Sequence, residues 1–554
     1  MDRLTFLTGG KALRQPNQSK SVSRTLSGLA PYAGPWGDAQ VAHLLKRTMF
    51  GSTKDDIAYF KSKTMSQAVN ELLTPAPVPS PPLKVWDNDL IQYPVSPDNS
   101  ITKGTTWVNA PLDGNYNFQR LMSVKGWWLG LMLNQNRSIH EKMTLFWHNH
   151  FATETETVYD ARYVYKHLAL LRQYALGNFK QFVKEITIDP AMLRYLNGSY
   201  NTKTAPDENY ARELQELFCC GKGNGSQYTE DDVKAAAKVL TGFRDNSTSI
   251  SYTFDSTRHD TSNKQFSAFY NNTVITGQSG AAGANELDQL LNMIFGVDEV
   301  ALFICRKLYI NFIYYEIDAA AEANVIQPLA NIFRTNNYNI LPVLDALFKS
   351  EHFYDAANMG CNIKSPMDFI VGYLRELQVA LPPSSNYVVQ YQHWQYFQAL
   401  GALYQQNLLD PPNVAGWPAY YQDPLFYEMW INSDTYPNRV KFTDAFTLLG
   451  YNRGGFVSKP DLLAFVDSFS NPEDPNKLLS DVLTSFYRIS ITTTTFDFIK
   501  NSTLLTGQTN DNYWTNAWTL YKADPTNAVN KNIVLTRLQN MFIYIMRLAE
   551  YQLS

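Results

Sequence analysis

Cysteine is scarce in this sequence, with 4 residues in 554. The four positions are Cys219, Cys220, Cys305 and Cys361. They show no CxxC spacing, which argues against a cysteine-based zinc site, and they are too few for a disulfide framework. Because a free cysteine usually behaves as a small hydrophobic residue, we expect all four to be buried in the core.

Clusters of basic residues and long apolar runs are also missing. The formal net charge is -4, which argues against a nucleic-acid partner, because binding a polyanion requires clustered Lys and Arg. The best candidate for a membrane span is ALFICRKLYINFIYY, and Arg306 and Lys307 interrupt it, so we expect no transmembrane segment. The N-terminal stretch lacks an apolar centre of about 7 to 15 residues, so we expect no signal peptide of the usual form.

Common catalytic motifs are absent as well. The sequence contains no Walker loop, GxGxxG, HExxH or GxSxG motif in a supporting context, which removes the commonest nucleotide-binding, zinc-protease and hydrolase classes. Aromatic residues, in contrast, are abundant, with 34 Tyr, 31 Phe and 11 Trp. They serve either as platforms for glycans or, more commonly, as part of a large core.

The sequence predicts a mainly α fold, a large globular body of many helices with long Pro- and aromatic-rich loops. A hydrophobic content of 45% is enough for a large core, and helical periodicity dominates. Asp189 and Thr229, for example, each precede a helical pattern as capping residues, and Pro190 suits a first helical position. Near 245–278 the pattern changes, and the alternation in SISYTF predicts a small β-hairpin or extended insertion.

Breaks in the helical pattern predict how the chain is organised. We expect a polar N-terminal arm at 1–36, a helical core domain at 37–438 and a C-terminal helical extension packed on it at 439–554. Within the core domain, the Pro-rich stretch 75–116 predicts a long surface loop, and 243–278 is the non-helical insertion.

The densest cluster of metal-capable side chains lies in SIHEKMTLFWHNHFATETE, from Ser138 to Glu156. It holds three of the eight histidines and three glutamates. Ser138 followed by Glu141 is typical of a capping box, so the sequence predicts a helix that begins at Ser138. We expect His140, in the first turn of that helix, to lie next to solvent.

The spacing of the other two histidines limits what they bind. On a continuous helix His148 and His150 point about 200° apart and cannot share one metal ion. They share a face only if the helix breaks between Trp147 and His150 and continues as an extended segment, which the alternation from Thr153 to Thr157 favours. The alternative is that Trp147, His148 and Phe151 are core residues while His150 caps the helix C-terminus.

A second cluster lies in PDENYARELQELF. Asn209, Glu213 and Glu216 follow the i, i+4, i+7 spacing of one helix face. Two carboxylates and an amide on one face are suited to bind a metal ion or to act as acid and base. Arg212 is placed to pair with Glu208 or Glu216, so a structural lattice of ion pairs is an equal alternative.

A third candidate is the RHD triplet inside the insertion. His259 beside Asp260 in a loop is suited to supply a metal ligand or a general base, although a solvated loop is the simpler interpretation. Together with the first two clusters it gives a His, Glu and Asp set of the kind that binds zinc, manganese or iron.

Pro, Gly and Trp are enriched in a fourth stretch, DPPNVAGWP at Asp410–Pro418, which is followed by WINS at Trp430–Ser433. Such loops form a recognition surface or the wall of a pocket, and the candidate binding residues are Asn413, Trp417 and Trp430. The alternative is a rigid turn that packs on its own tryptophan.

These motifs, in their order, resemble a bacterial family catalogued as domain of unknown function 1800 (DUF1800). The resemblance extends from about Ala42 to Ser433. The resembling stretches are AHLLKRTMFG, KMTLFWHNHFATE, YALGNFKQFVKEITIDPAMLRYLNG, ENYARELQELF, YTEDDVKAAAKVLTGF, RHD, FICRKLYINFI, IKSP, DPPNVAGWP and WINS.

The resemblance implies a mostly helical protein without an established activity. It also implies, for many relatives, a periplasmic, envelope or extracellular location, often reached by a twin-arginine leader. Here MDRLTFL resembles the RxFL part of that leader, while the second Arg and the apolar centre are missing. Relatives usually lack cysteine after ARELxEL, so Cys219 and Cys220 are particular to this sequence.

Two hypotheses for function follow. The first is a metal-dependent enzyme, hydrolytic or oxidative, that holds a divalent ion. Arg212 would orient the carboxylates, one of which would act as base. The predicted metal ligands are His148, His150, His259 and Glu213. The predicted catalytic residues are Glu213, Glu216, Arg212 and Asp260.

The second hypothesis is a non-enzymatic envelope or cell-surface component that binds a glycan or a partner protein through the loops at 75–116 and 410–433. The predicted binding residues are Asn413, Trp417 and Trp430 of the second of these loops, together with Asn209 of the second polar cluster. Geometry separates the two hypotheses. Convergence of the polar clusters within about 5 Å favours the enzyme, because charges couple at that range, and dispersal favours the binding protein.

Overall fold

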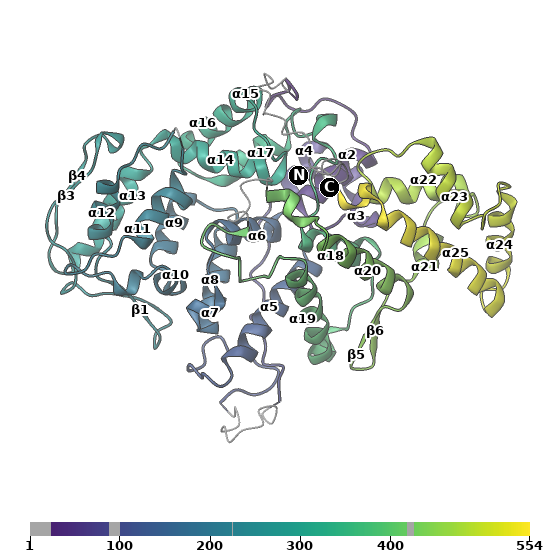
Figure 1. Ribbon diagram of the computed structural model, residues 1–554, viewed down its shortest axis with the longest axis horizontal. Coiled ribbons are helices and arrows are strands. Elements are labelled where there is room, and N and C mark those ends of the chain that lie inside the picture. Colours follow the sequence, from purple (N-terminus) through teal and green to yellow (C-terminus); the bar gives the residue numbers. More distant parts are fainter. Residues whose placement is uncertain (1–23, 88–99, 224, 418–425) are drawn as a thin grey trace, which may run out of the picture.

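The computed structural model describes residues 24–87, 100–223, 225–417 and 426–554. Within these ranges α-helices dominate, and named strands occur only as three two-stranded antiparallel sheets. The predicted mainly α fold is therefore confirmed. Figure 1 shows a broad helical body with α6 (His140–His150) near its centre.

Buried apolar side chains form two clusters. The first core includes Leu44, Phe182 and Leu308, and the second core includes Trp128 and Phe542. Helices that supply mainly the first core are α2 (Asp38–Thr48), α3 (Lys54–Lys61), α4 (Met65–Leu72), α9 (Phe179–Thr187), α10 (Pro190–Tyr195), α11 (Asn209–Glu213), α12 (Glu230–Val239), α13 (Glu286–Ile294), α14 (Asp298–Phe312), α15 (Ala319–Ala321), α16 (Gln327–Thr335) and α17 (Ile340–Phe348).

A second set of helices surrounds the second core. Its members are α5 (Asn117–Leu133), α7 (Thr155–Val158), α8 (Ala161–Gln173), α18 (Pro366–Glu376), α19 (Tyr387–Leu403), α20 (Thr435–Leu448), α21 (Leu462–Asp467), α22 (Pro475–Phe486), α23 (Thr493–Thr503), α24 (Asn512–Ala523) and α25 (Ala528–Arg547). In Figure 1 the α9 to α13 end and the α22 to α25 end lie on opposite sides of α6. In the described ranges, no helix is both long and apolar enough to cross a membrane.

The strands lie in short hairpins. β1 (Phe243–Asn246) pairs with β2 (Ser251–Phe254), and β3 (Lys264–Gln265) pairs with β4 (Val274–Ile275). Both hairpins lie in the expected insertion, which confirms it. A third hairpin was not expected, and it consists of β5 (Tyr451–Arg453) and β6 (Phe456–Ser458). Its turn contains Gly454 and Gly455, with φ of 59° and 78°, values that favour glycine in a tight hairpin turn.

Helix starts that depend on local chemistry were predicted correctly at two places. The Asp189 side chain accepts a hydrogen bond from Met192 N, and Thr229 forms a capping box with Asp232. Each cap satisfies backbone N–H groups that have no partner inside the helix.

The capping box predicted at Ser138 is wrong. The helix α6 begins at His140, and Ser138 Oγ donates instead to Thr74 O at 2.7 Å. Glu141 forms a buried ion pair with Arg172. His140 is also buried rather than next to solvent, with 6% of its surface exposed. Ser138 Oγ still accepts from His140 N at 3.3 Å, but partners from distant parts of the chain replace the reciprocal bonds of a capping box.

Two of the irregular segments are tied to the helices. The described parts of the predicted loop 75–116 hold no named helix or strand before α5, yet Trp86 and Trp107 from it are buried. Of the predicted arm at 1–36, residues 1–23 lie outside the described ranges. Beyond them, Tyr32 N donates to Lys349 O at 2.8 Å. The domain boundary expected near 438 stays a prediction.

All four cysteines are free thiols. Cys219, Cys220 and Cys305 are buried, as expected. Cys361 is only half-buried, so the expectation is wrong for this residue. Its sulfur accepts a hydrogen bond from Arg47 at 3.3 Å, because it lies in a polar loop rather than on the apolar face of a helix.

Candidate functional site

The helix α6 lies between the two cores and is continuous from His140 to His150. Met143 and Trp147 belong to the first core, whereas Leu145 belongs to the second. Because the helix does not break after Trp147, the last two histidines point in different directions, as helical geometry requires. The condition under which they would share one metal ion is therefore not met.

His148 lies on the side of the second core. Its ring is fully buried between Trp128 and Trp417, with centroid distances of 5.0 and 5.4 Å. Neither ring nitrogen has a hydrogen-bond partner among the described residues. Burial, together with nearby His167 and Lys125, lowers its pKa to about 3. His148 is therefore neutral at physiological pH and packs as an aromatic core residue.

His150 points to the first core. Its Nε2 donates to Phe218 O at 3.1 Å, and Lys307 Nζ donates to its Nδ1 at 2.9 Å. Burial and the charge of Lys307 lower the His150 pKa well below its usual value. The alternative prediction, that His150 caps the C-terminus of its own helix, is therefore wrong. The ring binds a carbonyl in a neighbouring π-helix, Leu214–Cys219.

That π-helix changes the geometry of the second cluster. Because α11 ends at Glu213 and a wider turn follows, the i, i+7 spacing of Asn209 and Glu216 no longer describes one face. Asn209 is exposed, whereas Glu216 accepts hydrogen bonds from Lys222 at 2.9 Å and Tyr228 at 3.3 Å. Burial and the charge of Glu216 raise the pKa of Glu213, so the two carboxylates still interact.

Arg212 pairs mainly with a residue that the sequence did not suggest. Both terminal nitrogens of its guanidinium donate to Glu230 at 2.7 Å, and one also donates to Glu208 at 3.2 Å. The pairing with Glu208 was anticipated, whereas Glu216 has other partners. These ion pairs are largely exposed and link the start of α11 to α12.

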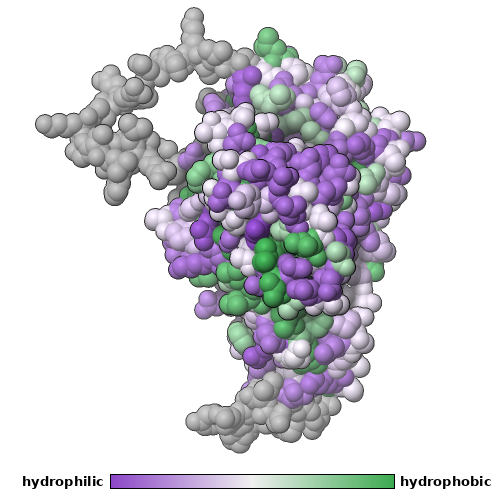
Figure 2. Space-filling model, turned by 90° about the vertical axis from the view of Figure 1, so that its right-hand side faces the viewer, coloured by the Kyte–Doolittle hydropathy of each residue, from purple (hydrophilic) through white to green (hydrophobic). Residues whose placement is uncertain are grey.

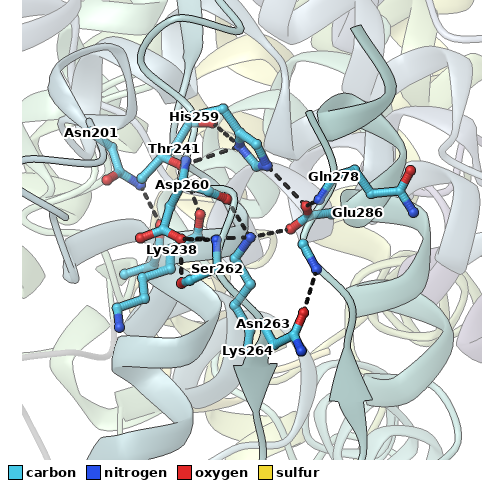
Figure 3. A network of polar contacts seen from close by, with 12 residues as sticks. Asn201, Lys238, Thr241, His259, Asp260, Ser262, Asn263, Lys264, Gln278 and Glu286 are labelled. Carbon is cyan, nitrogen blue, oxygen red and sulfur yellow. Dashed lines mark hydrogen bonds and ion pairs between the residues drawn. The ribbon is translucent and has the colours of Figure 1, made fainter. Parts of the chain in front are cut away.

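His259 belongs to a buried network next to β3, not to a solvated loop (Figure 3). Its Nε2 lies 3.0 Å from Glu286 Oε1, and its Nδ1 lies 2.9 Å from Thr241 O. Both ring nitrogens therefore lie within hydrogen-bond distance of an oxygen. Glu286 Oε2 also accepts from Lys264 at 2.6 Å. His259, Glu286 and Lys264 are each at most 1% exposed.

Asp260 completes this region without contacting His259 through its side chain. Its Oδ1 accepts hydrogen bonds from Ser262, including one from the backbone N at 2.8 Å (Figure 3). Burial acts to raise the Asp260 pKa, but the bonds from Ser262 and the charge of Lys264 outweigh it and lower the pKa. The carboxylate is therefore stabilised in its charged form by local donors.

The predicted metal ligands thus have separate surroundings. His148 contacts two tryptophans, His150 contacts Lys307, and His259 contacts Glu286. Across the part of the chain that the structure describes, no group of three or more His, Cys, Asp and Glu is arranged to hold a metal ion. A metal site formed by these side chains and Glu213 stays a prediction without geometric support.

The loop DPPNVAGWP lies against α6. Asn413 Oδ1 accepts from Ala415 N at 2.9 Å, which forms a tight turn, and Trp417 N donates to Asn149 Oδ1 at 2.9 Å. Gly416 has φ of 85°, and a Cβ there would lie 2.2 Å from Asn149 Oδ1. This close approach requires glycine. Asn413 therefore shapes the turn that places Trp417.

Next to Trp417 lies a central cavity of about 100 Å³. It is lined by residues of both cores' helices and of the connecting loops. Its polar lining includes Lys46, Arg47, Lys142, Asn149, Asp368 and Gln406, and its apolar lining includes Leu145, Phe146, Trp417 and Trp430. Lys142 forms an ion pair with Asp368, and Lys46 forms one with Glu376 behind the wall.

A second hollow lies at the opposite end of the second core. Figure 2 looks onto this end and shows hydrophobic residues gathered within a largely hydrophilic face. The groove runs between α24 and α25, has a volume of about 300 Å³ and is lined by Tyr513, Leu520 and Ile533 with several asparagines. It contains none of the predicted site residues.

Comparison with protein families identifies the chain. A family model described as protein of unknown function (DUF1800) matches residues 43–553. The chain belongs to the DUF1800 family. The matched range contains both cores except Val41 and Ala42 of the first, and it contains the lining of the central cavity except Ser554. No curated protein and no solved structure matches the chain.

Six of the stretches that resemble the DUF1800 family line the central cavity. They are AHLLKRTMFG with Lys46 and Arg47, KMTLFWHNHFATE with Lys142 and Asn149, FICRKLYINFI with Asn311, IKSP with Ser365, DPPNVAGWP with Trp417, and WINS with Trp430. Sequence reasoning missed the cations among them, because a Lys or Arg in a helical pattern is usually solvated. The feature of the sequence that could have identified these cations is their position inside stretches that resemble the family.

Proposed function

We propose that this DUF1800 protein is a binding protein whose central cavity holds a small ligand, or the end group of a glycan or partner protein. The observation that carries the proposal is the convergence of six distant stretches on one cavity. A pocket with apolar walls and a few convergent polar groups is the usual form of a ligand site.

The predicted metal-dependent enzyme has less support. Its proposed ligands are dispersed, and two of the three histidines have hydrogen-bond partners at both ring nitrogens. Two of the predicted binding residues, in contrast, line one cavity. These are Trp417 and Trp430, and Asn413 shapes the adjacent turn.

The aromatic walls are rigid rather than exposed platforms. Trp417 and Trp430 are 3% and 4% exposed. Trp417 is fixed through the hydrogen bond to Asn149 and by the close contact of Gly416. A preformed cavity lowers the conformational entropy that the protein loses when a ligand binds. The tryptophans therefore act as walls around a ligand group, and full truncation to Ala would also damage the core.

Ligand-observed NMR with a library of neutral sugars, acidic sugars and short peptides tests the proposal. We expect at least one class to bind, and Trp417→Phe or Trp430→Phe to weaken its affinity by about 10-fold, because each removes part of the wall. The Phe variants retain an aromatic ring, so the fold is expected to survive. Circular dichroism and the thermal midpoint check this.

Trp514→Phe is the matched control. Trp514 is fully buried in the second core and does not line the cavity. The Trp514→Phe variant is expected to lose about as much stability as the two cavity variants, without a change in its affinity for the ligand. Absence of binding by every compound, or equal loss of affinity in all three variants, would contradict a binding site in the cavity.

A further inference from the structure

The lining of the central cavity carries an excess of positive charge. Lys46, Arg47 and Lys142 line it, whereas Asp368 is the one acidic side chain among its described lining residues. Lys142 is paired with Asp368, and Lys46 is paired with Glu376. Arg47 donates only to neutral groups, namely Asn358 O at 3.2 Å and the sulfur of Cys361 at 3.3 Å.

Arg47 also has an unused donor. The residue is 4% exposed, and its Nε has no hydrogen-bond partner among the described residues. A buried donor without an acceptor costs about 1 to 3 kcal/mol, and more when the group is charged. An acceptor inside the cavity would remove this cost.

Two further cations lie behind the lining. Lys364 is between Ile363 and Ser365, and its ammonium lies 4.0 Å from the centre of the Tyr551 ring. Arg439 donates to Lys364 O at 3.0 Å. Arg439 also donates to Gln552 Oε1 at 3.3 Å. The ring, the carbonyl and the amide are neutral partners, so they leave both charges uncompensated.

Burial of these cations is nearly complete. Lys364 is 5% exposed and Arg439 is 0% exposed. Burial, with a contribution from Lys46, lowers the pKa of Lys364 to about 7, and burial lowers that of Arg439 to about 9. Two carboxylates, Glu376 and Asp368, act on Lys364. Each already has a partner, because Glu376 pairs with Lys46 and Asp368 pairs with Lys142. Among the side chains in this part of the molecule, positive charge therefore exceeds negative charge.

The backbone adds to the positive electrostatic potential in the cavity. Ser365 lines the cavity and is the N-cap of α18, an 11-residue helix. The N-terminal end of a helix carries a partial positive charge and favours anions. Asp368, in the first turn, uses part of this potential. The walls formed by Trp417 and Phe146 limit water, which strengthens each charge interaction inside the cavity.

We propose that the cavity takes the anionic end group of a ligand, a carboxylate, sulfate or phosphate, with Arg47 as the direct donor and Lys364 and Arg439 supplying charge behind it. This inference rests on the proposed binding function and names the chemistry of its ligand. A volume of about 100 Å³ admits one such group. The shared chemistry is an oxyanion, free or on an acidic sugar.

Isothermal titration at constant ionic strength tests the inference with four probes: glucose, glucuronate, glucose 6-phosphate and inorganic sulfate. We expect saturable binding of glucuronate and glucose 6-phosphate and none of glucose, which has the same ring without the anion. Binding of sulfate at similar affinity indicates a site for free anions. Binding of the sugar anions alone indicates an acidic glycan end.

Arg47→Met and Lys364→Met are each expected to weaken binding of the anionic probes by about 10-fold or more, because charge-assisted hydrogen bonds and nearby charges are lost. The Lys364 variant removes an unpaired charge and is expected to fold even if the Arg47 variant does not. Lys307→Met is the matched control. Burial also lowers the pKa of Lys307 to about 7, but its ammonium donates to His150, on the first-core side of α6.

Equal binding of glucose and glucuronate would overturn the anion inference while the binding function stands. Unchanged affinity in the Lys364 variant would also overturn it. Failure of every compound in the NMR library would instead overturn the binding function, so the two failures are distinguishable.

Discussion

Two of the molecule's groups of buried charges, one beside β3 and one around the central cavity, are built differently. Beside β3, Glu286 bridges His259 and Lys264, and each of the three is at most 1% exposed. Around the central cavity, Lys364 and Arg439 are similarly buried, yet their direct partners are an aromatic ring, a carbonyl and an amide.

The difference separates a structural network from a site that is ready for a ligand. A buried charge is tolerated when a counter-ion and hydrogen bonds replace water, as Glu286 does for its two partners. Without a counter-ion it lowers stability, and such groups are often found where a ligand supplies the missing charge. The network near His259 therefore has a structural role, whereas the cations around the cavity lack a negatively charged partner.

Removal of the counter-ion from the structural network is expected to have the largest effect. Glu286→Gln removes the negative partner of His259 and the nearer one of Lys264, which keeps only Asp260 Oδ1 at 3.9 Å. We expect the free energy of unfolding to fall by about 3 to 5 kcal/mol. Urea denaturation measures this. The neighbouring Asp288→Asn is the control, because Asp288 is 52% exposed and its pair with Lys184 is worth less than about 1 kcal/mol. Similar losses in both variants would remove the contrast.

Removal of the uncompensated cation Lys364 is expected to raise the free energy of unfolding rather than lower it. Lys364→Met replaces a buried charge with an apolar chain of similar length, and we expect an increase in unfolding free energy on the order of 2 kcal/mol at pH 6. Thermal or urea denaturation from pH 6 to 10 measures the difference from the wild type.

The pH dependence follows from the shifted pKa. The folded pKa of Lys364 is about 7 and its ordinary value is 10.5, so the unfolded chain binds the proton more strongly. The penalty is fully present below pH 7 and decreases as the pH rises toward 10.5. The advantage of the Met variant is expected to shrink over the same range. Lys222→Met, at an 80% exposed position, is expected to show no such trend.

The smallest expected effect concerns the uncharged ring beside the cavity. His148→Phe removes two nitrogens that have no described partner, so we expect a gain of about 1 kcal/mol or less in unfolding free energy. His150→Phe removes the partner of Phe218 O and of Lys307 and is expected to lose about 1 to 3 kcal/mol. Equal changes in the two variants would show that the two sides of α6 do not differ in this way.

Local sequence patterns predicted much of the fold. The caps at Asp189 and Thr229 and the β-hairpins in the insertion depend on residues within a few positions of each other, and they were predicted correctly. The capping box at Ser138 was wrong although its pattern was equally good. Thr74 and Arg172, distant in sequence, bind the two side chains.

The candidate site was predictable only in part. The loop with Trp417 and Trp430 was identified from its composition, and both residues line the cavity. The cations were missed because nothing within the local pattern distinguishes Lys46 or Lys364 from solvated residues. His259 was predicted as a site residue from the RHD triplet, but its partner Glu286 lies on α13, where the sequence has no recognisable motif.

The sequence by itself determined the helical class, the positions of most helices and hairpins, and the rule that His148 and His150 diverge on an unbroken helix. These features depend on hydrogen bonds and periodicity within a few residues. Only the tertiary structure decided that α6 stays unbroken, that it lies between two cores, and that cations from distant stretches surround one cavity. Burial and counter-ions are set by the packing of helices far apart in the chain, and a local pattern contains no information about them.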